Sequence, residues 1–354
     1  MAQARVLLLL SGRAEPAGFA RSVCGLLGLG PGPGPWRVYC GLERGRLLLS
    51  NSSFSGATAR LPLQRSPFCP FSALEQQPPG AAGPKQSPDR GVDLGVAVIL
   101  QSRDQTVLLT RRASSMHTAP NLWVPPGGHV ELDEELLDGG LRELWEETGL
   151  QLPQGQYSWF PLGLWESAYP PMLSQGHPRY HHIVLYVLLT SQETEQQLQE
   201  RIHPNQEEVS AYAWLKPDVL AAVAASEDGP EMTEPLSQYL PPFVQAVELQ
   251  GDVAQSLDLP VSILLRKSLN TRKNEERVLK VLATLLPKAR IGIKLDIRCQ
   301  ASSAPSKEAK ASSFRSRPQE SQVDEALSIS LWTYIGFTTF IVGENVTTIL
   351  KIRN

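Results

Sequence analysis

The clearest hydrophobic pattern of the chain lies between about residues 90 and 225. Short runs rich in β-branched and aromatic residues predict strands, because turn residues separate one run from the next. These runs are 92–101, 106–112, 157–168, 181–190 and 207–215. Residues 134–147, between two of these runs, and residues 216–225, after the last run, have apolar residues at the spacing of a helix. Strands and helices thus mix without strict alternation, which favours an α+β sandwich over a doubly wound parallel sheet.

The first 50 residues predict a small α/β unit of their own. Their pattern predicts a strand at 6–10 and a helix at 18–27, followed by paired strands at 36–41 and 46–50. Residues 51–89 are rich in Ser, Pro, Gly and Ala, a composition typical of linkers. The sequence therefore predicts a domain boundary near residue 90.

Beyond residue 236 the pattern weakens. Residues 266–298 carry ten Lys and Arg against three acids, and 275–286 has the spacing of an amphipathic helix. Residues 300–324 are rich in Ser, Ala, Lys and Gln, and we expect them to be disordered. The uncharged run 326–343 is short and polar for a membrane span, which needs about 20 apolar residues. We therefore expect an atypical, irregular tail over 237–354, with a membrane anchor as the disfavoured alternative.

Composition narrows the class of protein. The net charge of −3 and the 19% of charged residues argue against a general binder of polyanions. The four cysteines lie far apart without a CxxC pair, which argues against a zinc site or a disulfide framework and fits a reducing compartment. The apolar run at 6–10 is shorter than the roughly 7–15 residues of a signal peptide's apolar region. We expect a cytoplasmic location, with the nucleus as the alternative.

The predicted helix at the centre of the chain ends in a group of acids. Glu143, Glu146 and Glu147 are spaced i, i+3, i+4, so they share one face. Like charges at that spacing repel one another, and they also repel the partly negative C-terminus of the helix. Asp133 is expected to cap the start of this helix, and Gly149 is expected to end it.

A bound cation would remove this repulsion. Mg²⁺ binds carboxylate oxygens and keeps waters that serve substrate phosphates. Arg142 can hold Glu134 or a neighbouring acid by a charge-assisted hydrogen bond. A solvated acidic helix is the alternative, and the acids taken alone favour it.

Two glycines inside the same helix indicate close packing. Gly139 and Gly140 each cost a helix about 1 kcal/mol relative to alanine. They therefore suggest a face pressed against a sheet. Leu141 and Trp145 are expected to point toward that core.

The spacing over residues 128–150 resembles the Nudix box. It runs Gly128, five residues, Glu134, seven residues, Arg142-Glu143-Leu144, one residue, Glu146-Glu147, one residue, Gly149-Leu150. The preceding segment Trp-Val-Pro-Pro-Gly-Gly also resembles the family, and the resemblance covers about residues 90–225. It implies a Nudix hydrolase domain, placed at 90–236, with an α-β-α sandwich around a mixed β-sheet. It also implies Mg²⁺ or Mn²⁺ and cleavage of a nucleoside diphosphate from another group. Up to about residue 240 the chain resembles members of the family that act on the N7-methylguanosine cap of RNA.

The resemblance implies roles for the residues of the box, in an attack of water on a pyrophosphate phosphorus. The expected metal ligands are Glu143, Glu147, Glu146, Glu134 and the carbonyl oxygen of Gly127 or Gly128. Glu143 and Glu147 are the main ligands among them, and Glu146 is alternatively the base that activates water. Pairing with Arg142 is the favoured role of Glu134.

A general base outside the box is common in the family. Glu207 and Glu208, at the start of a predicted strand, are the candidates here. A solvated strand edge is the alternative for both.

Aromatic and basic residues outside the box are candidates for substrate binding. A methylated guanine is positively charged and favours aromatic faces by stacking and cation–π attraction. The candidates are Trp159, Phe160, Trp165, Tyr169 and Tyr180 for the base, Arg111 and Arg112 for phosphate, and the pair His181-His182. For each of them, ordinary packing or a solvated position is the alternative.

Three functions stay open at this point. The first is hydrolysis of m7GpppN-capped RNA to 7-methyl-GDP and 5′-monophosphate RNA. The second is hydrolysis of a small nucleotide such as ADP-ribose, coenzyme A or a modified nucleotide. The third is a binding module without turnover, against which the complete carboxylate set argues. No stable protein partner is implied, and a homodimer stays open because some members of the family dimerise.

Overall fold

The computed structural model describes residues 4–43, 46–75, 90–118, 120–225, 240–251 and 253–265. The chain divides into two compact units, 1–294 and 295–354, and every described residue lies in the first. The basic segment 266–298, the segment 300–324 and the uncharged run 326–343 lie outside the described residues. No helix within the described ranges has the length and apolar character that crossing a membrane requires.

The described part of residues 4–75 forms five strands and two short helices. They are β1 (Arg5–Leu10), β2 (Arg13–Pro16), α1 (Val23–Leu26), β3 (Trp36–Glu43), β4 (Arg46–Ser50), β5 (Ala59–Arg65) and α2 (Pro70–Glu75). The strands predicted at 6–10, 36–41 and 46–50 are confirmed. The helix predicted at 18–27 is wrong in length. Ser22 caps a helix of a single turn, and Gly18 before it forms a β-bridge with Gly91.

The segment predicted as a linker contributes to the sheet. β5 pairs in parallel with β10 (Tyr157–Tyr169) and antiparallel with β3, and α2 follows it. Its alternate residues Leu61, Leu63 and Arg65 are buried, a period of two that the surrounding Ser and Pro residues obscure. A linker beginning at residue 51 is therefore wrong, and only 76–89 of that span lie outside the described residues.

The region from 93 to 215 supplies the central strands. They are β6 (Asp93–Gln101), β7 (Val107–Arg112), β8 (Trp123–Val124), β9 (Gly127–His129), β10, β11 (Tyr180–Ser191) and β12 (Val209–Leu215). β6 and β11 run parallel, whereas β10 with β11 and β7 with β12 run antiparallel. The sheet is therefore mixed, and the predicted α+β class is confirmed.

Part of the segment predicted as an irregular tail is also ordered. β13 (Phe243–Gln250) pairs with β12 and forms an antiparallel hairpin with β14 (Val253–Pro260), which α6 (Val261–Leu265) follows. The prediction of an irregular tail is therefore wrong for residues 243–265. The hairpin lies at the edge of the sheet, where few of its side chains are buried. Among the residues of β14, only Leu259 is buried, so the hydrophobic alternation is weak.

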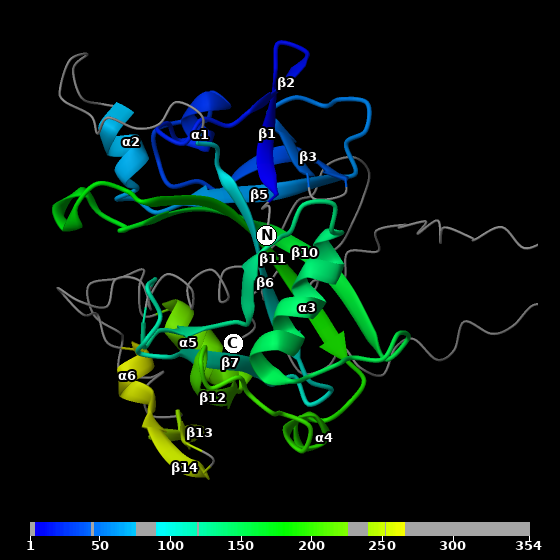
Figure 1. The fold of residues 1–354 in the computed structure, drawn as a ribbon, viewed down its shortest axis with the longest axis vertical. Helices are drawn as coiled ribbons and strands as arrows, with labels where there is room; N and C mark the ends of the chain where they lie inside the picture. Colours follow the sequence, from blue (N-terminus) through cyan, green and yellow to red (C-terminus); the bar gives the residue numbers. More distant parts are fainter. Residues whose placement is uncertain are drawn as a thin grey trace, which may run out of the picture. The chain divides into compact units, whose positions relative to one another are not determined.

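The described strands form one 14-stranded sheet in the order β14-β13-β12-β7-β6-β11-β10-β5-β3-β4-β1-β2. β8 lies beside β7, and β9 lies beside β6. β1 also pairs with β6, at Arg5 and Asp93. The N-terminal strands are thus continuous with the central ones (Figure 1).

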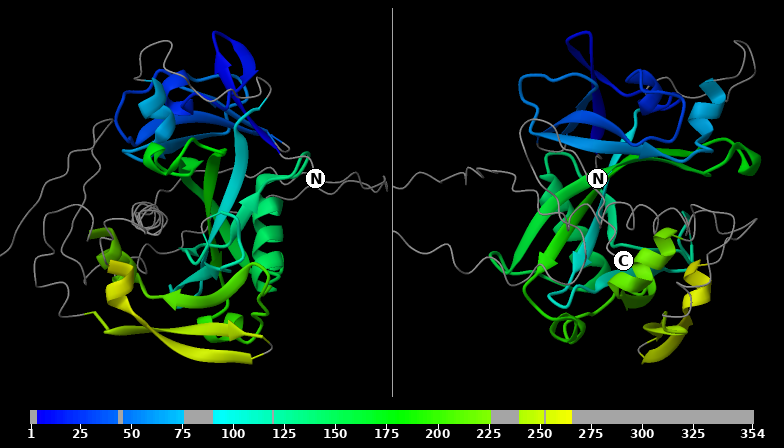
Figure 2. Two further views of the ribbon diagram at one scale, coloured as in Figure 1. Left: turned by 60° about the vertical axis from the view of Figure 1, so that its left-hand side comes forward. Right: turned by 180° about the vertical axis from the view of Figure 1, so that it is seen from behind.

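Helices cover both faces of the central strands (Figures 1 and 2). α3 (Leu136–Thr148) packs Gly140 against Val96 and Val98 of β6. α5 (Pro217–Ala225) instead packs Val219 into a cluster that includes Ile99 of the same strand. Successive residues of a strand point to opposite faces, so these helices lie on opposite sides. The predicted α-β-α sandwich is confirmed, with α4 (Glu195–Gln199) and the 3₁₀ turn η1 (Leu173–Gln175) as short connections.

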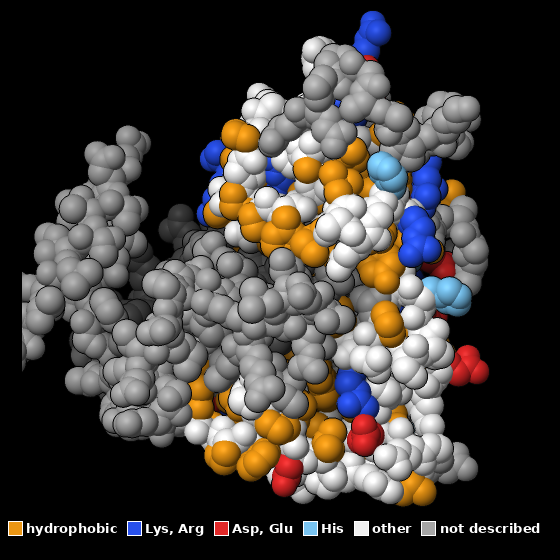
Figure 3. All heavy atoms as spheres, turned by 90° about the vertical axis from the view of Figure 1, so that its left-hand side faces the viewer, with side chains coloured by type: hydrophobic (Ala, Val, Ile, Leu, Met, Phe, Trp, Pro, Cys, Tyr) orange, Lys and Arg blue, Asp and Glu red, His pale blue; other side chains and the backbone are white. Residues whose placement is uncertain are grey.

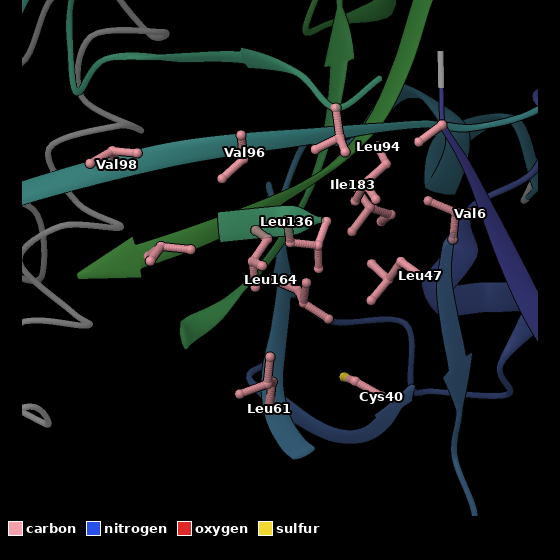
Figure 4. Packing of buried hydrophobic residues seen from close by; sticks show 14 of the residues in the cluster. Val6, Cys40, Leu47, Leu61, Leu94, Val96, Val98, Leu136, Leu164 and Ile183 are labelled. Atoms are coloured by element: carbon pink, nitrogen blue, oxygen red, sulfur yellow. The ribbon is translucent and has the colours of Figure 1, made fainter. Parts of the chain in front are cut away.

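The core on the α3 side crosses from the N-terminal strands into the central ones. Figure 4 shows Val6 and Leu47 beside Leu94 and Ile183, and all four are fully buried. Burial of each such side chain contributes roughly 1.5–3 kcal/mol relative to exposure. The N-terminal strands therefore share one hydrophobic core with the strands that carry the acidic helix.

Figure 3 shows one face of the molecule. On its described part, hydrophobic side chains occupy much of the surface, and Lys and Arg side chains lie mainly toward the edges, some of them next to one another near a histidine.

Candidate active site

The acidic helix begins later than its sequence suggested. Glu135 is the N-cap and makes no side-chain capping hydrogen bond, while Asp133 lies in a left-handed turn with a φ of 65°. The predicted cap by Asp133 is wrong because the chain turns there and Glu134 folds back to accept the Glu131 N–H at 3.1 Å. At the other end Gly149 has a φ of 73°, which confirms the predicted stop.

The mid-helix glycines bring α3 against the sheet, as predicted. A side-chain carbon at Gly140 would come within 3.0–3.3 Å of two valine side chains of β6. Leu141 packs against the core, but Trp145 is 49% exposed, so its predicted inward position is wrong. Leu144 occupies the core position, and the next residue lies about 100° further round the helix.

The loop before β12 covers the negative end of α3. The His203 N–H donates to the Thr148 carbonyl at 2.8 Å, and the Asn205 N–H donates to the Glu147 carbonyl at 3.0 Å. Carbonyl groups at a helix C-terminus lack partners within the helix. These two hydrogen bonds satisfy part of that end and bring the start of β12 to the acids.

Strand β9 passes very close to the same helix. A side-chain carbon at Gly127 would overlap the carbonyl oxygen of Val96, and one at Gly128 would lie within 2.5 Å of the Glu143 carboxylate. Only glycine allows such an approach of backbone to a neighbouring group. The structure thus places the Glu143 carboxylate directly against the peptide backbone from which a carbonyl ligand was predicted.

Arg142 is the centre of the hydrogen-bond network around the acids. Its Nε and Nη2 donate to the two oxygens of Glu134 at 2.9 and 3.1 Å, which confirms the predicted pair. Nη1 donates to Glu143 at 3.0 Å and to Glu146 at 2.9 Å, and Nη2 also donates to the His129 carbonyl at 2.9 Å. One guanidinium therefore offsets the repulsion among three carboxylates and ties α3 to β9.

Replacement of this guanidinium has a measurable cost. Arg142→Ala should lower the free energy of unfolding by about 2–3 kcal/mol, because hydrogen bonds to charged groups are worth roughly 1.5–3 kcal/mol. Arg142→Lys should lose less, since it keeps the charge without the planar fork. Urea unfolding of both variants checks this, with Arg103→Ala in the exposed β6–β7 turn as control. Equal stabilities of Arg142→Ala and the control would contradict the network.

Glu147 is the most buried acid of the helix, with 3% of its surface exposed. One oxygen accepts the Gly127 N–H at 3.2 Å, and the other accepts the Thr110 hydroxyl at 3.2 Å. Burial raises the pKa of this carboxyl to about 7 and also raises the pKa of Glu143. Burial therefore disfavours the charged forms of both carboxyls, although Arg112 lowers the pKa of Glu147 and Arg142 lowers the pKa of Glu143.

The donor set fits a hard divalent cation. Glu143, Glu147 and Glu146 supply carboxylate oxygens from one helix face, and the backbone of Gly127 and Gly128 lies against Glu147 and Glu143. Mg²⁺ and similar ions prefer such oxygen ligands. A cation there would stabilise the charged forms that burial now disfavours. Glu134 is less suited, because Arg142 engages both of its oxygens.

The structure separates the two candidate bases outside the helix. Glu208 is partly buried and close enough to Glu143 that its charge raises the pKa of the Glu143 carboxyl. Glu207 is exposed. Glu208 therefore faces the acids, whereas Glu207 points to solvent.

The substrate-binding candidates do not gather in one place. Trp165 is buried in the core on the face opposite α3, which removes it as a stacking platform. Arg111 donates to Glu248 at 2.6 Å and to Ser210 at 2.9 Å, so its charge is already paired. Arg112 lies near the acids, because its charge lowers the pKa of the Glu147 carboxyl.

The tyrosines predicted to stack on the base lie at the far end of the β10–β11 hairpin. The ring centroids of Tyr169 and Tyr180 are 6.4 Å apart, and Arg90 lies 5.7 Å over the Tyr180 ring. Trp159 is exposed but ten residues away on the same strand, about 33 Å at the usual rise. The tyrosine pair and Trp159 therefore belong to different surfaces, and Phe160 is partly buried beside Trp159.

The two adjacent histidines have separate environments. His181 is fully buried, with its ring nitrogens 3.0 Å from Glu166 and 2.8 Å from the Phe19 carbonyl, as expected of a structural histidine. His182 instead lies 3.1 Å from His129 between their Nε2 atoms. Burial lowers the pKa of both His129 and His182, the latter to about 3, so both rings are neutral near pH 7.

Three polar residues near the candidate sites were not predicted from the sequence: Thr110 beside Glu147, and Asp93 and His129 beside His182. Thr110 directly precedes the two predicted phosphate-binding arginines and contacts Glu147, so its place on the strand was a usable signal. Asp93 and His129 lie beside His182, far from it in sequence. Only the pairing of β6 with β9 and β11 brings them together.

Comparisons with known proteins agree with this geometry. The NUDIX domain family matches residues 91–236. The chain is 67% identical over 281 residues to the m7GpppN-mRNA hydrolase NUDT17 of Homo sapiens, a match that covers 78% of this chain and 85% of that protein. It is 68% identical over 281 residues to the Bos taurus protein of that name, covering 78% and 92%, and 46% identical over 242 residues to the Xenopus laevis one, covering 68% and 79%. The chain belongs to the NUDIX family.

Proposed function

We propose that the chain is a metal-dependent Nudix hydrolase that cleaves m7GpppN-capped RNA to 7-methyl-GDP and RNA with a 5′-monophosphate. The observation that carries the proposal is the position of Glu143 and Glu147 against the glycine backbone of β9, with Glu146 on the same face of α3. Relatives that share 67–68% of its residues over most of its length are named m7GpppN-mRNA hydrolases, which supports the choice of substrate.

Mg²⁺ or Mn²⁺ is the proposed cofactor. The residues that would hold it are Glu143, Glu147 and Glu146, with a carbonyl oxygen of Gly127 or Gly128 as a further donor. All of these are hard oxygen ligands, which suit both ions. When bound, the cation neutralises negative charge on the substrate phosphates.

The protein's own residues position the reaction around that charge. Arg142 fixes Glu143 and Glu146 from one side, and Thr110 with the Gly127 N–H fixes Glu147 from the other. Water attacks the phosphorus attached to the RNA. The bond from that phosphorus to the bridging oxygen breaks, and 7-methyl-GDP leaves with the bridging oxygen. The Glu208 carboxylate accepts the proton of the attacking water.

Glu207 and Glu208 form a matched pair for testing the base. Glu208→Gln should lower kcat by about 10²-fold or more, within the usual range for a general base. Glu207→Gln should leave kcat within about threefold of wild type, because that carboxyl is exposed. Steady-state kinetics on capped RNA across pH distinguishes them. Similar rates for the two variants would remove Glu208 from the reaction.

The cap-binding surface is proposed at the tyrosine pair. Tyr169 and Tyr180 carry adjacent rings at the end of the hairpin, and both are partly buried. Stacking of a base on an aromatic ring is worth about 1–3 kcal/mol. Tyr180→Ala should therefore raise KM for methyl-capped RNA more than KM for unmethylated capped RNA.

A substrate panel tests the proposed function as a whole. We would compare kcat/KM for methyl-capped RNA, unmethylated capped RNA, ADP-ribose and coenzyme A with Mg²⁺ or Mn²⁺. The proposal expects the highest value for methyl-capped RNA. A preference for ADP-ribose or coenzyme A would make the chain a small-nucleotide diphosphatase. Binding of all four without turnover would make it a binding module.

A further inference from the structure

A second group of metal-binding side chains lies on the face of the sheet opposite α3. The even-numbered residues Val96 and Val98 of β6 face α3, so its odd-numbered residues face away. Asp93 is one of these odd-numbered residues. His182 of β11 pairs with Asp93 in register, and His129 of β9 pairs with Gly95, two residues further along β6. Paired residues on adjacent strands point to the same face, so three strands direct polar side chains to one point.

Gly95 leaves the space in which the two histidines meet. Gly95 pairs with His129 of β9 on one side and with Val184 of β11 on the other. Because glycine has no side chain, the surface of β6 is open at this position. A side-chain carbon there would lie 3.2 Å from the Gly128 carbonyl oxygen and 3.6 Å from Val184. The His129 ring therefore extends across β6 toward His182.

The ligand atoms are already close together. The Nε2 atoms of His129 and His182 are 3.1 Å apart, and Asp93 Oδ2 lies 4.0 Å from His182 Nε2. All three ligand atoms lie within 4.8 Å of one another. Two imidazoles bound tetrahedrally to Zn²⁺ at about 2.0–2.1 Å place their nitrogens roughly 3.3 Å apart. The histidine pair needs almost no movement to match that separation. The carboxylate oxygen must approach His182 by about 0.7 Å and His129 by at most about 1.5 Å.

Neighbouring groups hold these ligands in place. Arg5 of β1 hydrogen-bonds Asp93 Oδ1, which leaves Oδ2 directed toward the histidines. The Tyr180 ring stacks on His182 with centroids 6.0 Å apart. Outer partners of this kind orient metal ligands and raise their affinity. Two cationic side chains lie near the site: Arg5 is paired with Asp93, and Arg90 lies 5.7 Å over the Tyr180 ring that stacks on His182.

We propose that Asp93, His129 and His182 bind a divalent transition-metal ion of the zinc class. Two imidazole nitrogens and one carboxylate oxygen suit Zn²⁺, whereas Mg²⁺ prefers oxygen alone. Three protein ligands leave a fourth position for water or an exchanging ligand. The wide spacing of the cysteines argued against zinc, but this site needs none.

This site is separate from the acids of α3. His129 points away from α3, whereas the adjacent Gly128 faces Glu143. A cation on His129 would also connect β9 to β11, which the described hydrogen-bond ladder joins only through β6. The site is thus distinct from the carboxylates of α3, although Tyr180 of the proposed cap-binding pair stacks on its ligand His182.

Calorimetric titration of the full-length protein with Zn²⁺ is the first test. The protein is treated with EDTA, dialysed, and titrated in excess Mg²⁺ so that carboxylate sites are occupied. Wild type should bind one zinc ion that His129→Ala and His182→Ala bind at least about tenfold more weakly. His177→Ala, an exposed histidine in the β10–β11 connection, should match wild type. Equal affinity and stoichiometry in all four proteins would overturn the proposal.

A measurement on wild type alone covers the case in which the variants do not fold. Cu²⁺ binds N and O sites more tightly than Zn²⁺ does, and its electron paramagnetic resonance spectrum reports ligand nitrogen. Couplings from two imidazole nitrogens at one equivalent of Cu²⁺ would support the site. A spectrum with oxygen ligands only would refute it.

Discussion

Glu147→Gln is expected to lower kcat on capped RNA by about 10²–10⁴-fold while the protein stays folded. The carboxylate is buried, accepts hydrogen bonds from Gly127 and Thr110, and lies beside Glu143. Glutamine keeps the shape, and its single carbonyl oxygen can still accept the Gly127 N–H while its amide nitrogen donates to the Thr110 hydroxyl. It removes the negative charge that a cation needs. Single-turnover rates with saturating Mg²⁺ measure the effect.

Glu146→Gln is the comparison for this variant. The Glu146 carboxylate is exposed and paired with Arg142, so its loss should lower kcat by about tenfold. A Glu147→Gln enzyme with kcat within threefold of wild type would contradict the proposed role. Circular dichroism and thermal unfolding establish that each variant is folded.

The pH dependence of stability tests the same carboxyl without substrate. Burial raises the folded-state pKa of Glu147 to about 7, from an ordinary value of 4.5. Between these values the folded state binds more protons than the unfolded state. The stability of metal-free protein should therefore fall as pH rises through that window, on the order of 1 kcal/mol per pH unit.

Urea unfolding in EDTA at about pH 5 and about pH 7.5 measures this effect. Glu147→Gln lacks the titration, so the variant should gain stability relative to wild type as pH rises. A constant difference between the two proteins at both pH values would show that the carboxyl is not perturbed.

Glu166→Ala is expected to cause the largest loss of stability, about 3–5 kcal/mol, because it removes one partner of a buried ionic network. The carboxylate lies on β10 and accepts hydrogen bonds from the Ser22 hydroxyl at 2.9 Å and the Val23 N–H at 2.6 Å. It also lies 3.0 Å from the His181 Nε2 atom. Arg65 donates to the same Ser22 hydroxyl at 2.6 Å. The loss of Glu166 would leave several buried polar groups unpaired between β10, β11 and the N-terminal residues.

Glu193→Ala provides the contrast. Its partner Arg201 is more than one-third exposed, so this ion pair should contribute less than about 1 kcal/mol. Chemical unfolding of both variants gives the two values side by side. A Glu166→Ala loss as small as that of Glu193→Ala would mean that the buried network does not connect the N-terminal strands to the sheet.

The acidic helix was predictable because its signals are local. The spacing of the carboxylates, the mid-helix glycines and the terminal Gly149 each act within a few residues, and the structure confirms the face and the stop. The start was less predictable, because an acid before a helix resembles a cap whether or not the chain turns there. Asp133 has the right residue type but a left-handed backbone.

Two strands, the inner strand β5 and the edge strand β14, were missed because their pairing depends on distant partners. β5 lies between β3 and β10, and its alternate residues Leu61 and Leu63 pack into the core. β14 has a partner on one side and shows little alternation. Composition therefore favoured a linker and an irregular tail where the sheet continues.

Long-range pairings account for most of what the sequence did not reveal about the sites. The bond from Arg142 to Glu134 follows from the box, but its contact with the His129 carbonyl requires β9 to pass the helix. The contact between His129 and His182 spans 53 residues. No local pattern distinguishes such a pair from two unrelated histidines. The predicted cytoplasmic location and the open question of a homodimer stay predictions.

The identity of the products shows which phosphorus of the cap is attacked and whether Glu147 is needed for the attack. RNA with a cap labelled in the phosphate next to the methylguanosine would be incubated with wild type and Glu147→Gln in the presence of Mg²⁺ or Mn²⁺. Wild type should release labelled 7-methyl-GDP and RNA with a 5′-monophosphate, and the variant should release almost no product. Release of 7-methyl-GMP with 5′-diphosphate RNA, or equal turnover by the variant, would contradict it.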